Sequence, residues 1–201
     1  MQDLKSCNPF RRIIFSTLTI APILFGVFSA SSAQAQNLFC NPSTRNPLQG
    51  FIEPTDGVGA ITSAHSGDYL YADDVAAPMG TPVKNMRYGT VVFTQDGFPD
   101  NGGGPSNFKR SNIVVVRYDD GPDCGPIKGD KKYYSLYLHL RNGSVKVQKG
   151  QKISAGTVIG VVGNSGWSTG PHLHVETSIS TGPQWWDRKT VPYIWTSKRN
   201  K

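Results

Sequence analysis

Two histidines separated by a single residue stand out in the stretch "GWSTGPHLHVE" (166–176), because the whole chain has only four. In a β-strand, side chains two positions apart project from the same face. We therefore expect His172, His174 and Glu176 to share one face, while the leucine and valine between them point into a core. Imidazole groups serve as metal ligands and as proton acceptors near neutral pH. A lone strand histidine is more often structural, so chemistry is indicated only if other histidines converge on this face.

The segment "KYYSLYLHL" (132–140) is predicted to be a second alternating strand. Its alternation assigns one face to Tyr133, Ser135, Tyr137 and His139, and the other face to Leu136, Leu138 and Leu140. If the two strands are near neighbours, three of the four histidines line a single sheet surface. Such a convergence favours catalysis or metal binding over a structural role.

The fourth histidine, His65, lies in the polar stretch "SAHSGDYLYADDVAAPMGTPV" (63–83), where three carboxylates follow it. Two histidines and one carboxylate are a frequent zinc ligand set that leaves the fourth position for water. The residues alone do not choose the carboxylate. Asp74 opens an apolar segment that fixes its position, Asp73 faces the opposite way, and Asp68 is close enough to His65 to cap a turn.

The elements that must position these residues are predicted to be strands. Glycine, proline and asparagine interrupt the chain beyond Cys40, and no long segment has the apolar spacing of a helix. Alternating or apolar stretches predict strands at 88–94, 112–118, 132–140, 157–163 and 172–179. Turn-rich segments at 95–111 and 119–131 are expected to join strands of one sheet. The prediction is an all-β fold: a compact antiparallel β-sheet or β-sandwich-like single domain with long loops.

The N-terminus has the three parts of a secretory signal peptide: a basic start, an uncharged apolar run and the small-residue sequence "AQAQ". We predict a signal peptide at residues 1–35, cleaved after Ala35, and an exported protein of the periplasm or extracellular space. The alternative is a retained membrane anchor, since the run is nearly long enough to span a bilayer. Cleavage leaves no stable membrane insertion.

Cleavage also changes the charge and the cysteine count. Losing the leader's three cations and one anion takes the net charge from +7 to +5. A basic chain suits an anionic partner, but its cations are scattered and export removes nucleic acid as a partner. Cys40 and Cys124 remain, and they are a candidate disulfide in an oxidising compartment. Two free thiols are the alternative.

Several blocks, in this order, resemble the lysostaphin-type, or LytM-like, zinc metallopeptidases that cut peptidoglycan peptides. The blocks are "DVAAPMGTPV" (74–83), "YLHL" (137–140), "GQKISAGTVIGVVG" (150–163) and "GVVGNSGWSTGPHLHVE" (160–176). The resemblance covers roughly residues 60–180, which we take as the metallopeptidase domain. A signal peptide at 1–35 and an N-terminal arm at 36–59 precede it. An aromatic and basic tail at 181–201 follows it, with tryptophans that either stack on substrate or pack over an open end of the sheet.

The resemblance implies a site built around one zinc ion. Asp74 and His174 match its ligands, and His139 and His172 match the histidines that act beside the metal. The commonest pattern has another ligand histidine four residues before the aspartate, where this chain has Leu70. We assign that role to His65, nine residues before Asp74.

The ligand set then defines the chemistry. A zinc-bound water has a pKa of about 7 and attacks the peptide carbonyl, while His139 and His172 transfer protons. Glu176 is either a carboxylate that orients an imidazole or part of a surface salt bridge. The glycine-rich turn, with Asn164, Gly166 and Ser168, either holds an extended peptide substrate or is an ordinary hairpin loop.

The sequence thus predicts an exported zinc endopeptidase that hydrolyses peptidoglycan stem peptides or cross-bridges. The alternative is an inactive family member that binds peptidoglycan or regulates another hydrolase. A third reading, a peptidase of glycine-rich proteins, is not separable from the first by sequence.

Overall fold

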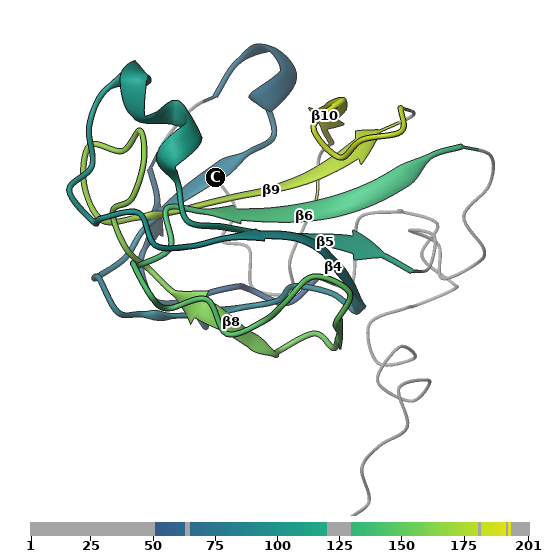
Figure 1. The fold of residues 1–201 in the computed structure, drawn as a ribbon, viewed down its shortest axis with the longest axis horizontal. Helices are drawn as coiled ribbons and strands as arrows, with labels where there is room; N and C mark the ends of the chain where they lie inside the picture. Colours follow the sequence, from purple (N-terminus) through teal and green to yellow (C-terminus); the bar gives the residue numbers. More distant parts are fainter. Residues whose placement is uncertain (1–50, 63–64, 120–129, 181, 192, 194–201) are drawn as a thin grey trace, which may run out of the picture.

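Short antiparallel strands and the loops between them make up nearly all the regular structure of the described chain (Figure 1). The computed structural model describes residues 51–62, 65–119, 130–180, 182–191 and 193. The predicted signal peptide and the predicted Cys40–Cys124 bridge lie outside these residues and stay predictions. No helix within the described residues is long and apolar enough to cross a membrane.

The large sheet has eight strands in the order β1-β2-β9-β6-β5-β4-β7, with β10 also paired to β9. Its strands are β1 (Ala60–Ile61), β2 (Asp73–Ala76), β4 (Gly89–Gln95), β5 (Ile113–Tyr118), β6 (Lys132–Leu138), β7 (Lys152–Ile153), β9 (Leu173–Ser180) and β10 (Arg188–Thr190). A second sheet pairs β3 (Pro82–Lys84) with β8 (Val158–Val161). Two 3-10 helices lie in loops, η1 (Gly67–Tyr69) and η2 (Pro105–Arg110).

The main core lies between the two sheets (Figure 1). Val83 and Ile159 from the small sheet pack with Val116, Leu173 and Val175 from the large one, and all five are at most 2% exposed. Phe51 and Tyr193, from the predicted arm and tail, are buried in the same core. A smaller cluster of Ile113, Val115, Tyr134 and Leu136 covers the opposite face of the large sheet. Two layers around one core confirm the all-β prediction.

The five predicted strands are all present, with ends that differ by at most two residues. β4 and β5 flank the segment 95–111, β5 and β6 flank the segment 119–131, and each pair is antiparallel as expected. The five shorter strands were not predicted, because two to four residues are too few to show a period. In the tail, the ring of Trp185 packs on Phe93, whereas Trp186 is 56% exposed.

Candidate metal centre

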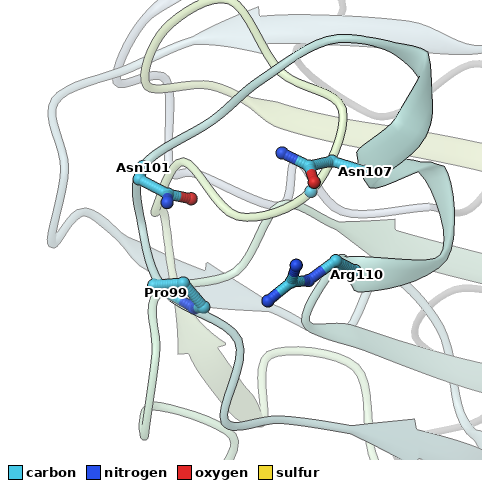
Figure 2. A pocket seen from close by; sticks show the side chains of 5 residues that line it. Pro99, Asn101, Asn107 and Arg110 are labelled. Atoms are coloured by element: carbon cyan, nitrogen blue, oxygen red, sulfur yellow. The ribbon is translucent and has the colours of Figure 1, made fainter.

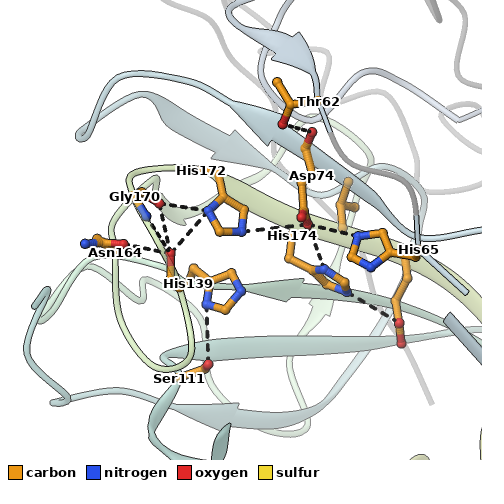
Figure 3. A network of polar contacts seen from close by, with 12 residues as sticks. Thr62, His65, Asp74, Ser111, His139, Asn164, Gly170, His172 and His174 are labelled. Carbon is orange, nitrogen blue, oxygen red and sulfur yellow. Dashed lines mark hydrogen bonds and ion pairs between the residues drawn. The ribbon is translucent and has the colours of Figure 1, made fainter. Parts of the chain in front are cut away.

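The pairing of β2 with β9 places Asp74 directly opposite His174. Side chains of such a cross-strand pair emerge on the same face and lie close together. The Nδ1 atom of His174 is 2.8 Å from Oδ1 of Asp74. The backbone carbonyl of Asp74 accepts from the Thr62 amide at 2.9 Å. Two polar side chains 100 positions apart in sequence are therefore brought together by strand register alone (Figure 3).

His65 joins this pair from the loop before η1. Its Nε2 atom is 3.3 Å from Oδ1 of Asp74, and its ring meets the His174 ring edge-on at 5.0 Å. The intervening loop is tied to β10, because the Thr190 hydroxyl donates to the Asp68 carbonyl and accepts from the Tyr71 amide. That attachment lets a histidine nine residues before Asp74 reach it.

One ligand atom from each of His65, Asp74 and His174 lies within 4.8 Å of the other two. Zinc bonds of roughly 2.0–2.2 Å in a tetrahedron place neighbouring ligand atoms about 3.4 Å apart, so this donor set fits zinc with small adjustments. The other candidate carboxylates lie elsewhere. The Asp68 side chain is 66% exposed, and Asp73 is buried on the opposite face, beside Tyr193.

Glu176 lies on the far side of His174 from Asp74. Its Oε2 atom is 3.6 Å from Nε2 of His174, and its Oε1 atom accepts from Nε of Arg188. Glu176 is fully buried, so its ion pair with Arg188 is not a surface salt bridge. A carboxylate on Nε2 favours the tautomer with Nδ1 free to bind a metal. Arg188 is a member of the site that sequence reasoning missed, since an isolated basic residue in a tail carries no signal.

Electrostatics of the cluster follow from this arrangement. Burial disfavours the charged form of His174, but the neighbouring carboxylates of Asp74 and Glu176 outweigh it and raise its pKa to about 9. Burial also opposes ionisation of Glu176, yet His174 and Arg188 lower the pKa of that carboxyl. A metal ion bound through Nδ1 of His174 would therefore compete with a proton for that ring.

His139 reaches the site through a change of backbone conformation. β6 ends at Leu138, which pairs with His174, and the next residue has a φ of 63°. The predicted alternation is wrong from this point. It placed His139 with Tyr137 and Leu140 with Leu136, whereas Leu140 packs with Tyr137 in the main core. A left-handed backbone is uncommon outside glycine, and it turns the imidazole toward His172 and His174, at ring distances of 4.6 and 6.1 Å.

Backbone carbonyls fix the tautomers of both remaining histidines. Nδ1 of His139 donates to the Ser165 carbonyl at 2.7 Å, and Nδ1 of His172 donates to the Gly170 carbonyl at 2.8 Å. Each neutral ring then presents an unprotonated Nε2. Burial and the neighbouring His172 lower the pKa of His139 to about 3, which keeps that ring neutral. Nε2 of His172 is 3.7 Å from Oδ1 of Asp74 (Figure 3).

In the glycine-rich turn, the residues that were predicted to bind substrate make hydrogen bonds and packing contacts within the protein. The Ser168 hydroxyl donates to Oδ1 of Asn164 at 2.7 Å and lies 3.2 Å from Nδ1 of His172. Gly166 has a φ of 79° and packs so tightly that a Cβ atom would stand 2.0 Å from Oγ of Ser111. These contacts give Gly166 and Ser168 a positioning role toward the histidines.

Asn112 connects this turn to its neighbours and was also missed from the sequence. Its side chain donates to the carbonyls of Phe98 and Leu140 and accepts from the Phe98 amide. Its own amide donates to Oγ of Ser165, the residue whose carbonyl holds His139. An asparagine at the start of a strand reads as a turn residue in the sequence, so its buried role had no signal.

A small hollow lies beside this turn, lined by Pro99, Asn101, Asn107, Arg110 and Gly166 (Figure 2). The residues that precede η2 and those of η2 itself supply most of it. None of its lining residues except Gly166 was singled out by the sequence.

Two histidines and an aspartate around one point, with two more histidines beside them, form a donor set that could hold a metal ion. Residues 69–185, more than half of the chain, match the family model Peptidase family M23. The chain belongs to this family, and the resemblance to lysostaphin-type peptidases is confirmed.

Two curated relatives share the matched region. The peptidoglycan DD-endopeptidase ShyA of Vibrio cholerae serotype O1 is 37% identical over 110 residues, which are 55% of this chain and 20% of that protein. Lysostaphin of Staphylococcus staphylolyticus is 28% identical over 138 residues, which are 69% of this chain and 24% of that protein. The chain thus spans about a quarter or less of the length of these relatives.

Among solved structures, the catalytic domain of the antimicrobial peptidase lysostaphin from Staphylococcus simulans is similar. Its sequence identity is 26% and its TM-score 0.42, over 67% of this chain and 84% of that chain.

Proposed function

We propose that this protein is an exported zinc endopeptidase that hydrolyses peptide bonds in peptidoglycan stem peptides or cross-bridges. The observation that supports it most is the arrangement of all four histidines around Asp74. His65, Asp74 and His174 are the proposed ligands of one zinc ion, and His139 and His172 the proposed proton-transfer groups. The relative named as a peptidoglycan DD-endopeptidase supports the substrate class.

Zinc, when bound, would supply a Lewis acid and lower the pKa of its water toward about 7. The chain's own residues do the rest. His139 and His172 each point a lone pair at the reacting centre, because backbone carbonyls hold their Nδ1 protons. One Nε2 accepts the proton of the attacking water, and the resulting imidazolium delivers it to the leaving amine. The Nε2 of the other ring accepts from a bridging water, whose second hydrogen then faces the negative charge that develops on the carbonyl oxygen.

Glu176 has the proposed task of orienting a ligand. The Glu176 carboxylate fixes the His174 ring through its 3.6 Å contact with Nε2, on the side away from Asp74, and Arg188 balances the charge of Glu176. Nδ1, on the side of the ring that faces Asp74, would thereby stay free of a proton when a metal ion is bound.

The test is zinc content and peptidoglycan digestion by the purified mature chain, compared with His65→Ala and Asp74→Ala variants. We expect one zinc per chain in the parent, loss of zinc in both variants, and release of soluble fragments from peptidoglycan only by the parent. Zinc that persists without His65 would overturn that ligand. Full zinc with no hydrolysis of peptidoglycan would support the alternative, a binding or regulatory protein.

A further inference from the structure

The hollow beside the glycine-rich turn combines a cation with amide groups. Arg110 and the side chains of Asn101 and Asn107 line it (Figure 2). Its volume of about 30 Å³ exceeds the roughly 10–15 Å³ that one water molecule needs. The hollow therefore admits a small polar group from a ligand.

Arg110 has no acidic partner among the residues that the structure describes. Its guanidinium carbon lies 5.7 Å from the centre of the Phe98 ring, an arrangement that holds the side chain by a cation–π contact. The two acids of the same loop accept from backbone amides instead: Asp100 from Asn142 and Asn164, and Asp96 from Gly143 and Val145. The N–H donors of Arg110 are thus available to an incoming group, and the full positive charge of the guanidinium favours an anionic one.

Two chain segments connect the hollow to the proposed catalytic groups. Arg110 precedes Ser111, whose Oγ is 3.5 Å from Nδ1 of His139. Gly166 follows Ser165, whose carbonyl accepts from the same Nδ1 at 2.7 Å. On each segment the hollow is one residue away from a group that touches Nδ1 of His139, so it lies within a few residues' length of an extended peptide that contacts this ring.

We propose that Arg110 binds a carboxylate of the peptide substrate and so selects carboxylate-bearing stem peptides over uncharged glycine peptides. Guanidinium and carboxylate form paired, charge-assisted hydrogen bonds, and the asparagine amides add donors at the rim. An oligoglycine segment offers this cation no counter-charge. The inference rests on the proposed function, because it names the substrate class of that site.

The test compares a synthetic peptidoglycan stem peptide carrying free carboxylates with an otherwise identical peptide whose carboxylates are carboxamides. Binding of both to the zinc-loaded chain is measured by titration calorimetry. We expect the carboxylate form to bind about tenfold more tightly, and the preference to weaken with added salt because Arg110 is exposed. Arg110→Gln should abolish the preference. Lys109→Gln, which removes the adjacent cation outside the hollow, should retain it.

Equal binding of the two peptides by the parent, undetectable binding of both, or a preference that survives in Arg110→Gln would overturn the inference. Hydrolysis of peptidoglycan is measured in parallel. A carboxylate preference without any hydrolysis would reject the proposed function and leave the role of Arg110 intact. Hydrolysis without a preference would reject the role of Arg110 alone.

Discussion

Adding one methyl group at Gly166 should lower the stability of the fold by a readily measurable amount. Its φ of 79° lies in the left-handed region, which costs an alanine about 1–2 kcal/mol. A Cβ atom there would also stand 2.0 Å from Oγ and 2.9 Å from the backbone N and Cα of Ser111. Overpacking of this kind costs about 1–3 kcal/mol. We therefore expect Gly166→Ala to lower the free energy of unfolding by roughly 3 kcal/mol.

Thermal unfolding of the metal-loaded chain measures this change. For a domain of this size, each kcal/mol shifts Tm by roughly 4 °C, so Tm should fall by about 12 °C. Hydrolysis should fall as well, because the strain moves the Ser165 carbonyl that holds His139. Gly170→Ala is the matched control, since nothing lies within 4 Å of a Cβ atom there and its φ is not left-handed.

A double variant separates the two contributions. Gly166→Ala with Ser111→Gly removes the Oγ clash, while the contact with the Ser111 backbone and the left-handed φ remain. We expect partial recovery of Tm relative to a Ser111→Gly parent. The reasoning is refuted if Gly166→Ala unfolds at the same temperature as the parent, or if Gly170→Ala is equally destabilised.

Three further perturbations address the ligand set, proton transfer and the turn. Glu176→Gln should weaken zinc binding about tenfold, because it removes the carboxylate that orients His174; competition with a chelator measures this. His139→Ala should reduce kcat by about 10²–10⁴-fold while zinc content, measured by elemental analysis, stays at the parental level. Asn112→Ala removes three side-chain hydrogen bonds, so the free energy of unfolding in urea should fall by about 3 kcal/mol.

Each of these has a control and a contrary outcome. The control for Glu176→Gln is Asp68→Asn, which removes an exposed carboxylate from the loop that carries His65 and should leave zinc affinity unchanged. Unchanged zinc affinity in Glu176→Gln would contradict the proposal that Glu176 orients His174. Loss of zinc in His139→Ala would make that residue a ligand. The control for Asn112→Ala is Asn142→Ala, which changes an exposed asparagine and should leave the free energy of unfolding in urea nearly unchanged. Equal stabilities of the two variants would contradict the stabilising role of the Asn112 hydrogen bonds.

The sequence predicted the features that follow from local periodicity. Alternation in β9 assigned Leu173 and Val175 to the core, and both are fully buried there. It also correctly predicted that His174 and Glu176 share one face, because side chains two positions apart in a strand point the same way. The grouping of His65 with Asp74 followed from residue types and the family resemblance, and the structure brings the two within 3.3 Å.

Features set by distant partners were not predictable. The left-handed turn at His139 is held by its carbonyl accepting from the Gly163 amide and by the Leu140 amide donating to the Asn112 carbonyl. Both partners are more than twenty residues away in sequence. Arg188 likewise gains its role only because β10 pairs with β9 beside Glu176. A period in the sequence carries no information about such pairings.

The strand register that places Asp74 opposite His174 also determines at what stage of synthesis and folding the site can form. The first of these strands leaves the ribosome long before the second, and every strand of the large sheet from β4 to β7 lies between them in the chain. Until β9 has docked between β2 and β6, the carboxylate has no imidazole opposite it. The proposed metal site is therefore a property of the completed sheet, and a nascent or truncated chain that lacks β9 cannot assemble it.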